Sequence, residues 1–354
     1  MNLTSSIPIR KVRESRKDTN SIAQPVFGSS ISDHMFVCQY KQGQWLEPTI
    51  MPFGNLSISP AALALHYGQS VFEGMKAFPG VDGRVRIFRM EQHYLRFKRS
   101  LERMCMPAPD FDLFQLALTE LVRTDIDWVP AITGGSLYIR PFIFASEGRF
   151  GVKVSDEYHF VVFTGPVPAL FAKPIRVKVE TDYIRAAPGG TGFAKCAGNY
   201  GAAFLPTQLA REQGYDQVIW TSGGTDPMIE ESGVMNIMFV VNDTLITPAL
   251  SDTILAGVTR DSLLQIARSR GWQVEERPVA VGELAIWLKD GHLQEAFGAG
   301  TAAVVAPIGC IAVNGKDYEL PLAEGQSYMM QLKAEMAAIR SGAVPDRYNW
   351  NHLV

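Results

Sequence analysis

The chain has 354 residues, of which 47% are hydrophobic and 19% are charged, and its formal net charge is −3. This balance is typical of a globular protein and excludes a largely disordered one, while the length favours two domains. The nearly neutral charge argues against a nucleic-acid or membrane-surface partner, and no apolar run approaches the ~20 residues that a membrane helix needs. We therefore expect a cytoplasmic protein.

The cysteines give no sign of a metal site or a disulfide framework. They are scattered, without a Cys-x-x-Cys pair or a histidine at metal-ligand spacing, so we expect buried thiols in a reducing compartment. They are Cys38, Cys105, Cys196 and Cys310. The basic start of the chain lacks the apolar region of a signal peptide and predicts a solvated arm. A transit peptide is the alternative, and Glu14 and Asp18 weaken it.

The first half of the chain predicts strands and two amphipathic helices. The turn residues 80–83 precede a short strand over 85–88. From Met90 to Met104 apolar residues recur at spacings of three and four, which indicates one face of a helix that ends before Pro107. A second helix is expected over 113–123, and strands are expected over 136–144 and 158–163.

A cluster of Gly165, Pro166 and Pro168 predicts a linker after the last of these strands. We expect a small N-terminal domain over 1–165, a linker over 166–174 and a large C-terminal domain over 175–354. The second domain has strand patterns at 175–179, 217–221 and 236–241, and helix patterns at 200–213, from 259 to Gly271, and at 327–341. Together these patterns predict two α/β domains with a cleft between them.

Lys195 stands out because small and apolar residues surround it, in the sequence Gly-Phe-Ala-Lys-Cys-Ala-Gly. A lone lysine is most often a solvated surface charge, and that is the alternative interpretation. Desolvation lowers the pKa of a lysine, and the neutral amine is the form that attacks an aldehyde. The flanking residues therefore favour Lys195 as a reactive amine.

The carboxylate of Glu231 precedes the apolar run 234–241. An acid is rarely buried unless it is paired, so a surface turn with Glu230 is one interpretation. The other is a carboxylate that faces a pyridine nitrogen and keeps it protonated, which makes the ring an electron sink. Spacing alone does not choose between the two.

Several further patterns are candidate anion sites. Arg96, on the first predicted helix, is either a solvated charge or a phosphate anchor. Gly257-Val258-Thr259 precedes a helix start, where free amide N–H groups attract phosphate. The glycine-rich turn 297–303 lacks the lysine of a nucleotide-binding loop and fits a smaller anion. Tyr138 and Arg140 share a strand face by alternation, and Arg140 is either a carboxylate ligand or a surface arginine.

With these residues in view, the chain resembles the branched-chain amino acid aminotransferases of the fold-type IV pyridoxal-phosphate class over nearly its whole length. The motifs that carry the resemblance are Ser32-Asp33-His34-Met35, His66-Tyr67-Gly68-Gln69-Ser70-Val71-Phe72-Glu73-Gly74, Tyr138-Ile139-Arg140-Pro141, Ala194-Lys195-Cys196-Ala197-Gly198-Asn199-Tyr200, Glu231-Ser232-Gly233-Val234-Met235-Asn236, Gly257-Val258-Thr259-Arg260-Asp261 and Gly298-Ala299-Gly300-Thr301-Ala302. The resemblance implies an α/β (α+β) fold of two domains, the larger one built on a barrel-like sheet, with pyridoxal 5′-phosphate in the cleft between them. It also implies a homodimer.

By this resemblance Lys195 binds the cofactor aldehyde covalently and later moves a proton during the reaction. Tyr200 would hydrogen-bond the phenolate oxygen of the cofactor, and Glu231 would face its ring nitrogen. The residues implied at the phosphate are Arg96, Val258, Thr259 and Thr301. Those implied at the substrate are Tyr67, Phe72, Tyr138, Arg140, Ala302 and the apolar wall residue Phe27.

The implied reaction exchanges an amino group between L-leucine, L-isoleucine or L-valine and 2-oxoglutarate, giving the branched 2-oxo acid and L-glutamate. Leu170 departs from the family pattern and leaves the fine substrate preference open. Val234 replaces a threonine beside the cofactor, which implies the loss of one hydroxyl contact. Within the same fold, a D-amino acid aminotransferase or an aminodeoxychorismate lyase would share Lys195 and Glu231. A cofactor-binding protein without turnover is the alternative from a different class.

Overall fold

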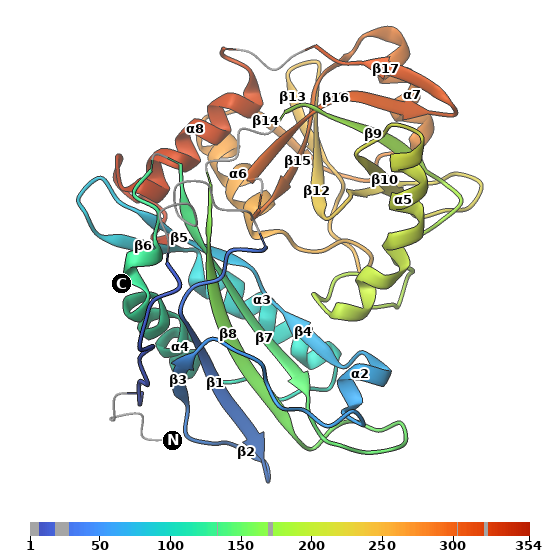
Figure 1. The fold of residues 1–354 in the computed structure, drawn as a ribbon. Coiled ribbons are helices and arrows are strands. Elements are labelled where there is room, and N and C mark those ends of the chain that lie inside the picture. Colours follow the sequence, from blue (N-terminus) through green and yellow to red (C-terminus); the bar gives the residue numbers. More distant parts are fainter. Residues whose placement is uncertain (1–6, 18–27, 133, 169–172, 303, 322–324) are drawn as a thin grey trace. The chain divides into compact units, whose positions relative to one another are not determined.

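The structure, a computed structural model, describes residues 7–17, 28–132, 134–168, 173–302, 304–321 and 325–354. The chain divides into two compact units (Figure 1). The first unit comprises Met1–Leu170, Ala194–Gly198 and Ala338–Val354, and the second comprises Phe171–Phe193 and Asn199–Ala337. The sequence-based domain ranges stay a prediction. The units differ from them because two later segments belong with the N-terminal residues, which makes the first unit the longer one. Part of the predicted linker, 169–172, lies outside the described residues.

The first unit is built on an antiparallel sheet with the strand order β18-β6-β5-β7-β8-β1-β2, in which β3 pairs with β1 and β4 with β7. Its strands are β1 (His34–Lys41), β2 (Gln44–Trp45), β3 (Thr49–Pro52), β4 (Ser70–Phe72), β5 (Met75–Pro79), β6 (Val85–Phe88), β7 (Ser136–Ala145), β8 (Tyr158–Val167) and β18 (Asn351–Leu353). The long hairpin of β7 and β8 lies at its centre. The three strands predicted in this half of the chain are confirmed in β6, β7 and β8.

Two amphipathic helices cover one face of this sheet (Figure 1). The helices of the unit are α2 (Leu63–Tyr67), α3 (Met90–Arg103), α4 (Phe111–Thr124) and the 3-10 turn η1 (Ile126–Trp128). The buried faces of α3 and α4 carry Phe97 and Phe114, which join Leu137 and Ile139 of β7 in one core. Both helices were expected from the spacing of their apolar residues, and the structure confirms them.

The strand β8 continues past the point where the sequence predicted a linker. Gly165 and Pro166 belong to the strand and pair with Tyr138 and Leu137 of β7. Proline has no N–H to donate, but it is tolerated here because the pairing of β8 with β1 ends at Phe163. Glycine is required at 165, where a Cβ atom would lie 2.3 Å from the Ser30 carbonyl oxygen. The strand therefore ends at Val167 and not at the predicted Phe163.

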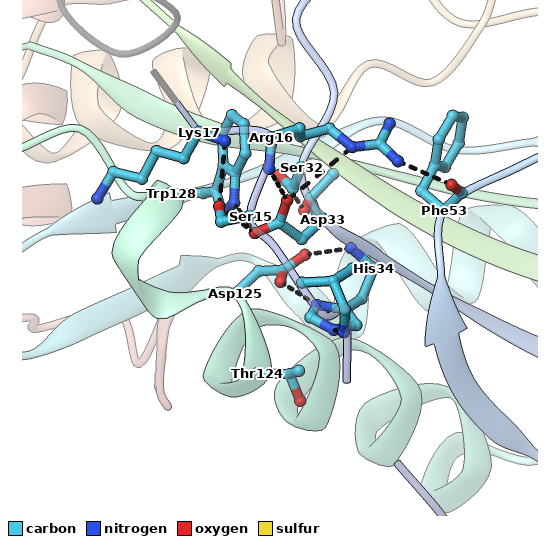
Figure 2. Close-up of polar contacts among 12 residues, drawn as sticks. Ser15, Arg16, Lys17, Ser32, Asp33, His34, Phe53, Thr124, Asp125 and Trp128 are labelled. Atoms are coloured by element: carbon cyan, nitrogen blue, oxygen red, sulfur yellow. Dashed lines mark hydrogen bonds and ion pairs between the residues drawn. The ribbon is translucent and has the colours of Figure 1, made fainter. Parts of the chain in front are cut away.

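A polar network centred on the buried Asp33 holds Ser15 and Arg16 next to the first sheet (Figure 2). Asp33 accepts hydrogen bonds from the Ser15 hydroxyl at 2.6 Å, the Arg16 N–H at 2.8 Å and the Trp128 ring N–H at 3.0 Å. Further towards the N-terminus, Ile7 is buried in the core. The described part of the predicted solvated arm is therefore anchored, because side chains distant in the sequence supply its partners.

The second unit is built on a closed barrel. Its strands β11, β10, β9, β16, β15 and β12 follow one another as hydrogen-bonded neighbours, and β11 also pairs with β12, which closes the ring of six. The strands of the unit are β9 (Ile175–Glu180), β10 (Gln217–Thr221), β11 (Ile229–Ser232), β12 (Met235–Val241), β13 (Thr244–Thr247), β14 (Gln273–Glu276), β15 (Leu293–Gly300), β16 (Val304–Val313) and β17 (Lys316–Glu319). The barrel-like sheet expected from the resemblance is confirmed.

Helices of the second unit pack around this barrel (Figure 1). They are η2 (Ala197–Ala203), α5 (Phe204–Glu212), α6 (Val258–Ser269), α7 (Val281–Asp290) and α8 (Tyr328–Ser341), of which η2 begins and α8 ends with residues of the first unit. The expected helix at 200–213 is an α-helix only from Phe204, since the residues before it form a 3-10 turn. Among the described helices, none has the length and apolar character required to cross a membrane.

The cysteines are free thiols, and three of them follow the expectation of burial. Cys38, Cys196 and Cys310 are buried, whereas Cys105 is exposed. Cys105 adopts a positive φ of 53° just after α3, in a turn on the surface. The prediction of a buried thiol was wrong at this position, because the chain turns away from the core where the helix ends.

Candidate active site

Lys195 is held at its backbone by two neighbouring elements of the first unit. Its N–H donates a hydrogen bond to the Ser100 hydroxyl of α3 at 2.9 Å, and its carbonyl accepts one from the Phe72 N–H at 3.1 Å. The next residue, Cys196, forms an isolated bridge with Val71 of β4. The backbone that carries the lysine is therefore fixed from both sides.

The side chain of Lys195 lies in an apolar and cationic environment. It is half-buried, with its Nζ 4.7 Å from the centre of the Phe72 ring. Desolvation and then the positive charge of Arg96 lower the pKa of Lys195, against the opposing effects of Glu73 and Tyr138. A lowered pKa increases the neutral fraction of the amine, which is the nucleophilic form. The interpretation of Lys195 as a solvated surface charge is wrong.

Arg96 lies on the inward face of α3, with 5% of its surface exposed. Its Nε donates to Glu73 Oε1 at 2.6 Å and its Nη2 donates to Glu73 Oε2 at 2.8 Å. The ring Nδ1 of His93 lies 2.9 Å from the same Oε2. The alternative of a solvated arginine is therefore excluded. Arg96 is a buried and oriented cation next to the lysine.

Glu73 is the buried carboxylate that pairs with this arginine, and 0% of its surface is exposed. Burial alone would raise the pKa of Glu73, but the charge and hydrogen bonds of Arg96 hold that pKa well below its ordinary value. Glu73 was given no role from its sequence position alone. The available signal was an acid between Phe72 and Met75, where the neighbours are apolar, since a buried acid requires a partner.

Tyr138 and Arg140 lie together on one face of β7, as the alternation predicted. The Arg140 Nη2 donates to the Tyr138 hydroxyl at 3.1 Å, and the Arg140 guanidinium lies 4.8 Å from the centre of the Phe72 ring. Phe72 therefore contacts both this arginine and Lys195. Gly74 is required beside them, because a Cβ atom there would lie 1.9 Å from the Tyr138 hydroxyl.

Glu231 lies on β11 in the second unit, with 4% of its surface exposed. Its Oε1 accepts a hydrogen bond from the Leu255 N–H at 2.7 Å, and its Oε2 lies 3.3 Å from the Nε of Arg185. The surface-turn interpretation is therefore wrong. Arg185 was not among the predicted residues, since it lies 46 positions before its partner in the chain and no local pattern connects the two.

The α6 helix begins beside this carboxylate, at the N-cap residue Gly257, which has no side chain to cap the helix. A Cβ atom at Gly257 would lie 1.9 Å from Asn236 Oδ1, so close backbone approach requires glycine here. The first helical residues, Val258 and Thr259, are buried. Their N–H groups have no partner within the helix and lie at its positive end, where an anion is stabilised.

The pairing of barrel strands determines how Glu231 lies relative to the glycine-rich turn after β15. Glu231 pairs with Asn236 of β12, and Asn236 pairs in turn with Ala299 of β15. Thr301 and Ala302 follow directly after β15 and are half-buried. Gly298 lets Met235 approach, since a Cβ atom there would lie 2.6 Å from the methionine Cε. The barrel therefore places the carboxylate on β11 and the glycine-rich turn after β15 on the two sides of β12.

Comparison with known proteins agrees with this geometry. The profile of the amino-transferase class IV family matches residues 70–311. The chain is 44% identical over 329 residues to branched-chain-amino-acid transaminase 1 of Bacillus subtilis (strain 168), and the match covers 92% of each chain. The chain belongs to the class IV aminotransferases. Within that family, this curated relative is a branched-chain-amino-acid transaminase.

Solved structures of the family confirm the fold-type IV architecture. A branched-chain amino acid aminotransferase from Escherichia coli superposes with a TM-score of 0.73 at 25% identity, covering 90% of this chain and 98% of that one. The branched-chain amino acid aminotransferase from Thermobaculum terrenum, solved in its PLP-form, gives a TM-score of 0.74 at 24% identity, with 90% and 97% covered. The topology described above is thus that of known aminotransferases.

For the remaining predicted residues of this class IV aminotransferase, the structure gives mainly their burial. Tyr200 is half-buried in η2, and Tyr67 is 44% exposed at the end of α2. Val234 is 67% exposed in the turn between β11 and β12. Phe27 and Leu170 lie outside the described residues. The roles assigned to all of these positions stay predictions.

Proposed function

We propose that this aminotransferase transfers the amino group of L-leucine, L-isoleucine or L-valine reversibly to 2-oxoglutarate, with pyridoxal 5′-phosphate as its cofactor. The products are the branched 2-oxo acid and L-glutamate. The observation that carries the proposal is Lys195, a half-buried amine with a lowered pKa beside the fixed cation of Arg96. The branched-chain substrate class is supported by the names of the curated relatives.

The residues present fit the proposed cofactor. Lys195 is suited to bind an aldehyde, because its pKa is lowered. Arg96 is a fixed cation of the kind that binds a phosphate. The Val258 and Thr259 amides at the start of α6 are proposed as further phosphate donors. Glu231 supplies a buried carboxylate for a protonated ring nitrogen. Thr301 and Tyr200 are proposed as further ligands of the phosphate and the phenolate oxygen.

When bound, pyridoxal 5′-phosphate supplies the aldehyde that takes up the amino group and a ring that withdraws electrons from the substrate Cα. The Lys195 Nζ is proposed to act as nucleophile towards that aldehyde and as the base that takes the proton from Cα. Ser100 and Phe72 fix the lysine backbone, so only the side chain that carries Nζ has to move. Positioning of this kind lowers the entropic part of the barrier.

Glu231 is proposed to hold a proton on the ring nitrogen. Its carboxylate is already oriented by the Leu255 N–H and by Arg185, so no rearrangement is required when charge develops on the ring. A carboxylate fixed in a buried site stabilises a positive charge more strongly than one in water. The chain therefore carries its own counter-charge for the proposed electron sink.

Two kinds of substrate side chain must be accepted, one aliphatic and one with a carboxylate. Phe72 supplies an apolar surface for the first, while Arg140 and Tyr138 supply donors for the second. Arg140 stacked on the Phe72 ring keeps its charge at the margin of an apolar surface. Tyr67 and Ala302 are proposed as further substrate contacts, and Phe27, which lies outside the described residues, stays a prediction.

Steady-state kinetics with 2-oxoglutarate as acceptor test the function. We expect turnover of L-leucine, L-isoleucine and L-valine and none of D-alanine. Turnover of D-alanine alone would favour a D-amino acid aminotransferase instead. Tight cofactor binding without turnover of any amino acid would favour a binding protein. We also propose a homodimer in the cytoplasm; sedimentation at a monomeric mass would contradict the dimer.

A further inference from the structure

One buried face of α3 connects the proposed phosphate anchor with the proposed catalytic lysine. His93, Arg96 and Ser100 follow at spacings of three and four, and all three are buried. The Ser100 hydroxyl accepts a hydrogen bond from the Lys195 N–H and donates one to the Arg96 carbonyl at 2.9 Å. Opposite this face lies Glu73, directly after β4.

Glu73 receives four donors, which fix its carboxylate. The Arg96 Nε reaches Oε1 at 2.6 Å. Three groups converge on Oε2: the Arg96 Nη2 at 2.8 Å, the His93 Nδ1 at 2.9 Å and the Gly74 N–H at 3.0 Å. A guanidinium bound through two nitrogens to one carboxylate has its plane fixed. Nη1 is the nitrogen that Glu73 does not engage.

The charges of His93, Arg96 and Glu73 fit a cluster that orients the Arg96 side chain. Arg96 and Glu73 form a buried ion pair, and desolvation lowers the pKa of His93 against the opposing effect of Glu73, which favours the neutral form of the ring. A neutral His93 donates through Nδ1 without adding a charge next to Arg96. It therefore braces the carboxylate and leaves the arginine as the cation of the cluster.

We propose that Glu73, braced by His93, is the positioning residue that aims Arg96 at the cofactor phosphate, an inference that rests on the proposed function. Glu73 itself touches the arginine and not the phosphate. Its removal therefore weakens recognition of the phosphate group selectively. Binding of the same ring system without a phosphate is left unchanged.

The test compares two ligands of the enzyme freed of cofactor, pyridoxal 5′-phosphate and pyridoxal. For Glu73→Gln we expect the affinity for pyridoxal 5′-phosphate to fall about 10-fold, the effect of a weakened charge-assisted contact, with the pyridoxal affinity unchanged within about twofold. Glu73→Asp keeps the charge and should recover part of the loss. Glu102→Gln, on the exposed side of the same helix, is the matched control and should behave as wild type.

A double-mutant comparison shows whether Glu73 acts through Arg96. Once Arg96→Gln has removed the guanidinium, adding Glu73→Gln should produce no further loss of phosphate-dependent affinity. If Glu73→Gln fails to fold, His93→Gln keeps the ion pair and should show the same selective loss, about threefold. Circular dichroism checks folding in each variant.

Equal weakening of pyridoxal 5′-phosphate and pyridoxal, or no weakening of either, would overturn the inference. Both outcomes are read from binding alone, without any amino acid substrate. Failure of the proposed function would be seen separately, as a wild-type enzyme that does not turn over L-leucine. The two failures are therefore distinguishable.

Discussion

The first unit contains two buried pairs of histidine and carboxylate that look alike in isolation. In one, the His93 Nδ1 lies 2.9 Å from Glu73 Oε2; in the other, the His34 Nδ1 lies 2.6 Å from Asp125 Oδ1 (Figure 2). All four residues are buried. Residue type, burial and distance therefore do not tell which pair belongs to an active site.

Their neighbours differ, and these decide what each pair does. The Nε2 of His34 accepts a hydrogen bond from the Val12 N–H at 3.1 Å, so this pair anchors the start of the chain. Glu73 instead holds Arg96, which lies beside the lysine. Desolvation raises the pKa of Asp125, whose side-chain partner is His34, whereas Arg96 lowers the pKa of Glu73 against the same desolvation. The His34 pair contacts the N-terminal segment, and the Glu73 pair orients Arg96, the proposed phosphate anchor.

The largest effect is expected at Lys195, the lysine next to the Glu73 pair. Lys195→Ala removes the proposed nucleophile and base, and we expect the rate of transamination to fall by on the order of 10² to 10⁴-fold or more. Single-turnover kinetics with L-leucine measure the loss. Full activity in this variant would contradict the site. His34→Gln serves as the control that changes the other pair.

The next effect concerns stability. Glu73→Gln leaves the Arg96 charge without its partner, and we expect the free energy of unfolding at pH 7 to fall by about 3 kcal/mol. Because the folded pKa of Glu73 lies below 4.5, its carboxylate stabilises the fold above that pH, and the contribution is lost as the pH falls further. Urea unfolding at several pH values should show the difference from wild type shrinking in acid. A constant difference would be inconsistent with an ionised Glu73.

A smaller effect is expected at the other pair. His34→Gln disturbs a buried hydrogen-bonded contact with the N-terminal arm, and the free energy of unfolding should fall by about 1–3 kcal/mol. Affinity for pyridoxal 5′-phosphate and turnover should remain near wild type, because this pair does not hold a group of the site. Hydrogen exchange at Val12 should become faster. A selective loss of cofactor affinity in His34→Gln would contradict the assignment of different roles to the His34–Asp125 and His93–Glu73 pairs.

The smallest expected effect concerns Asp125, whose contribution to the free energy of unfolding should change with pH in the direction opposite to that of Glu73. The folded pKa of Asp125 is raised above 3.8, so its contribution to stability is present below that pH and is lost as the pH rises through the folded value. Relative to Asp125→Asn, wild type should therefore lose stability on going from below pH 3.8 to neutral pH. Paired unfolding curves measure this change. A gain with rising pH would show that Asp125 behaves like Glu73.

Local sequence patterns were sufficient for several elements. The apolar spacing from Met90 to Met104 identified α3, and the alternation around Tyr138 and Arg140 placed both side chains on one face. The composition around Lys195 indicated a desolvated amine, which its lowered pKa supports. These inferences succeeded because helix and strand periods, and the character of adjacent residues, are properties of short segments.

Other features depended on residues far apart in the chain. Glu73 and Arg96 are 23 positions apart, and Ser100 contacts Lys195 from 95 positions away. The anchoring of the arm by Asp33, the continuation of β8 through Pro166 and the closure of the six-stranded barrel likewise involve distant partners. Local patterns were enough to predict several of the helices and strands and to indicate that Lys195 is desolvated. Which buried charges meet depended on the folded chain, because the free energy of a buried charge depends on partners that no local pattern specifies.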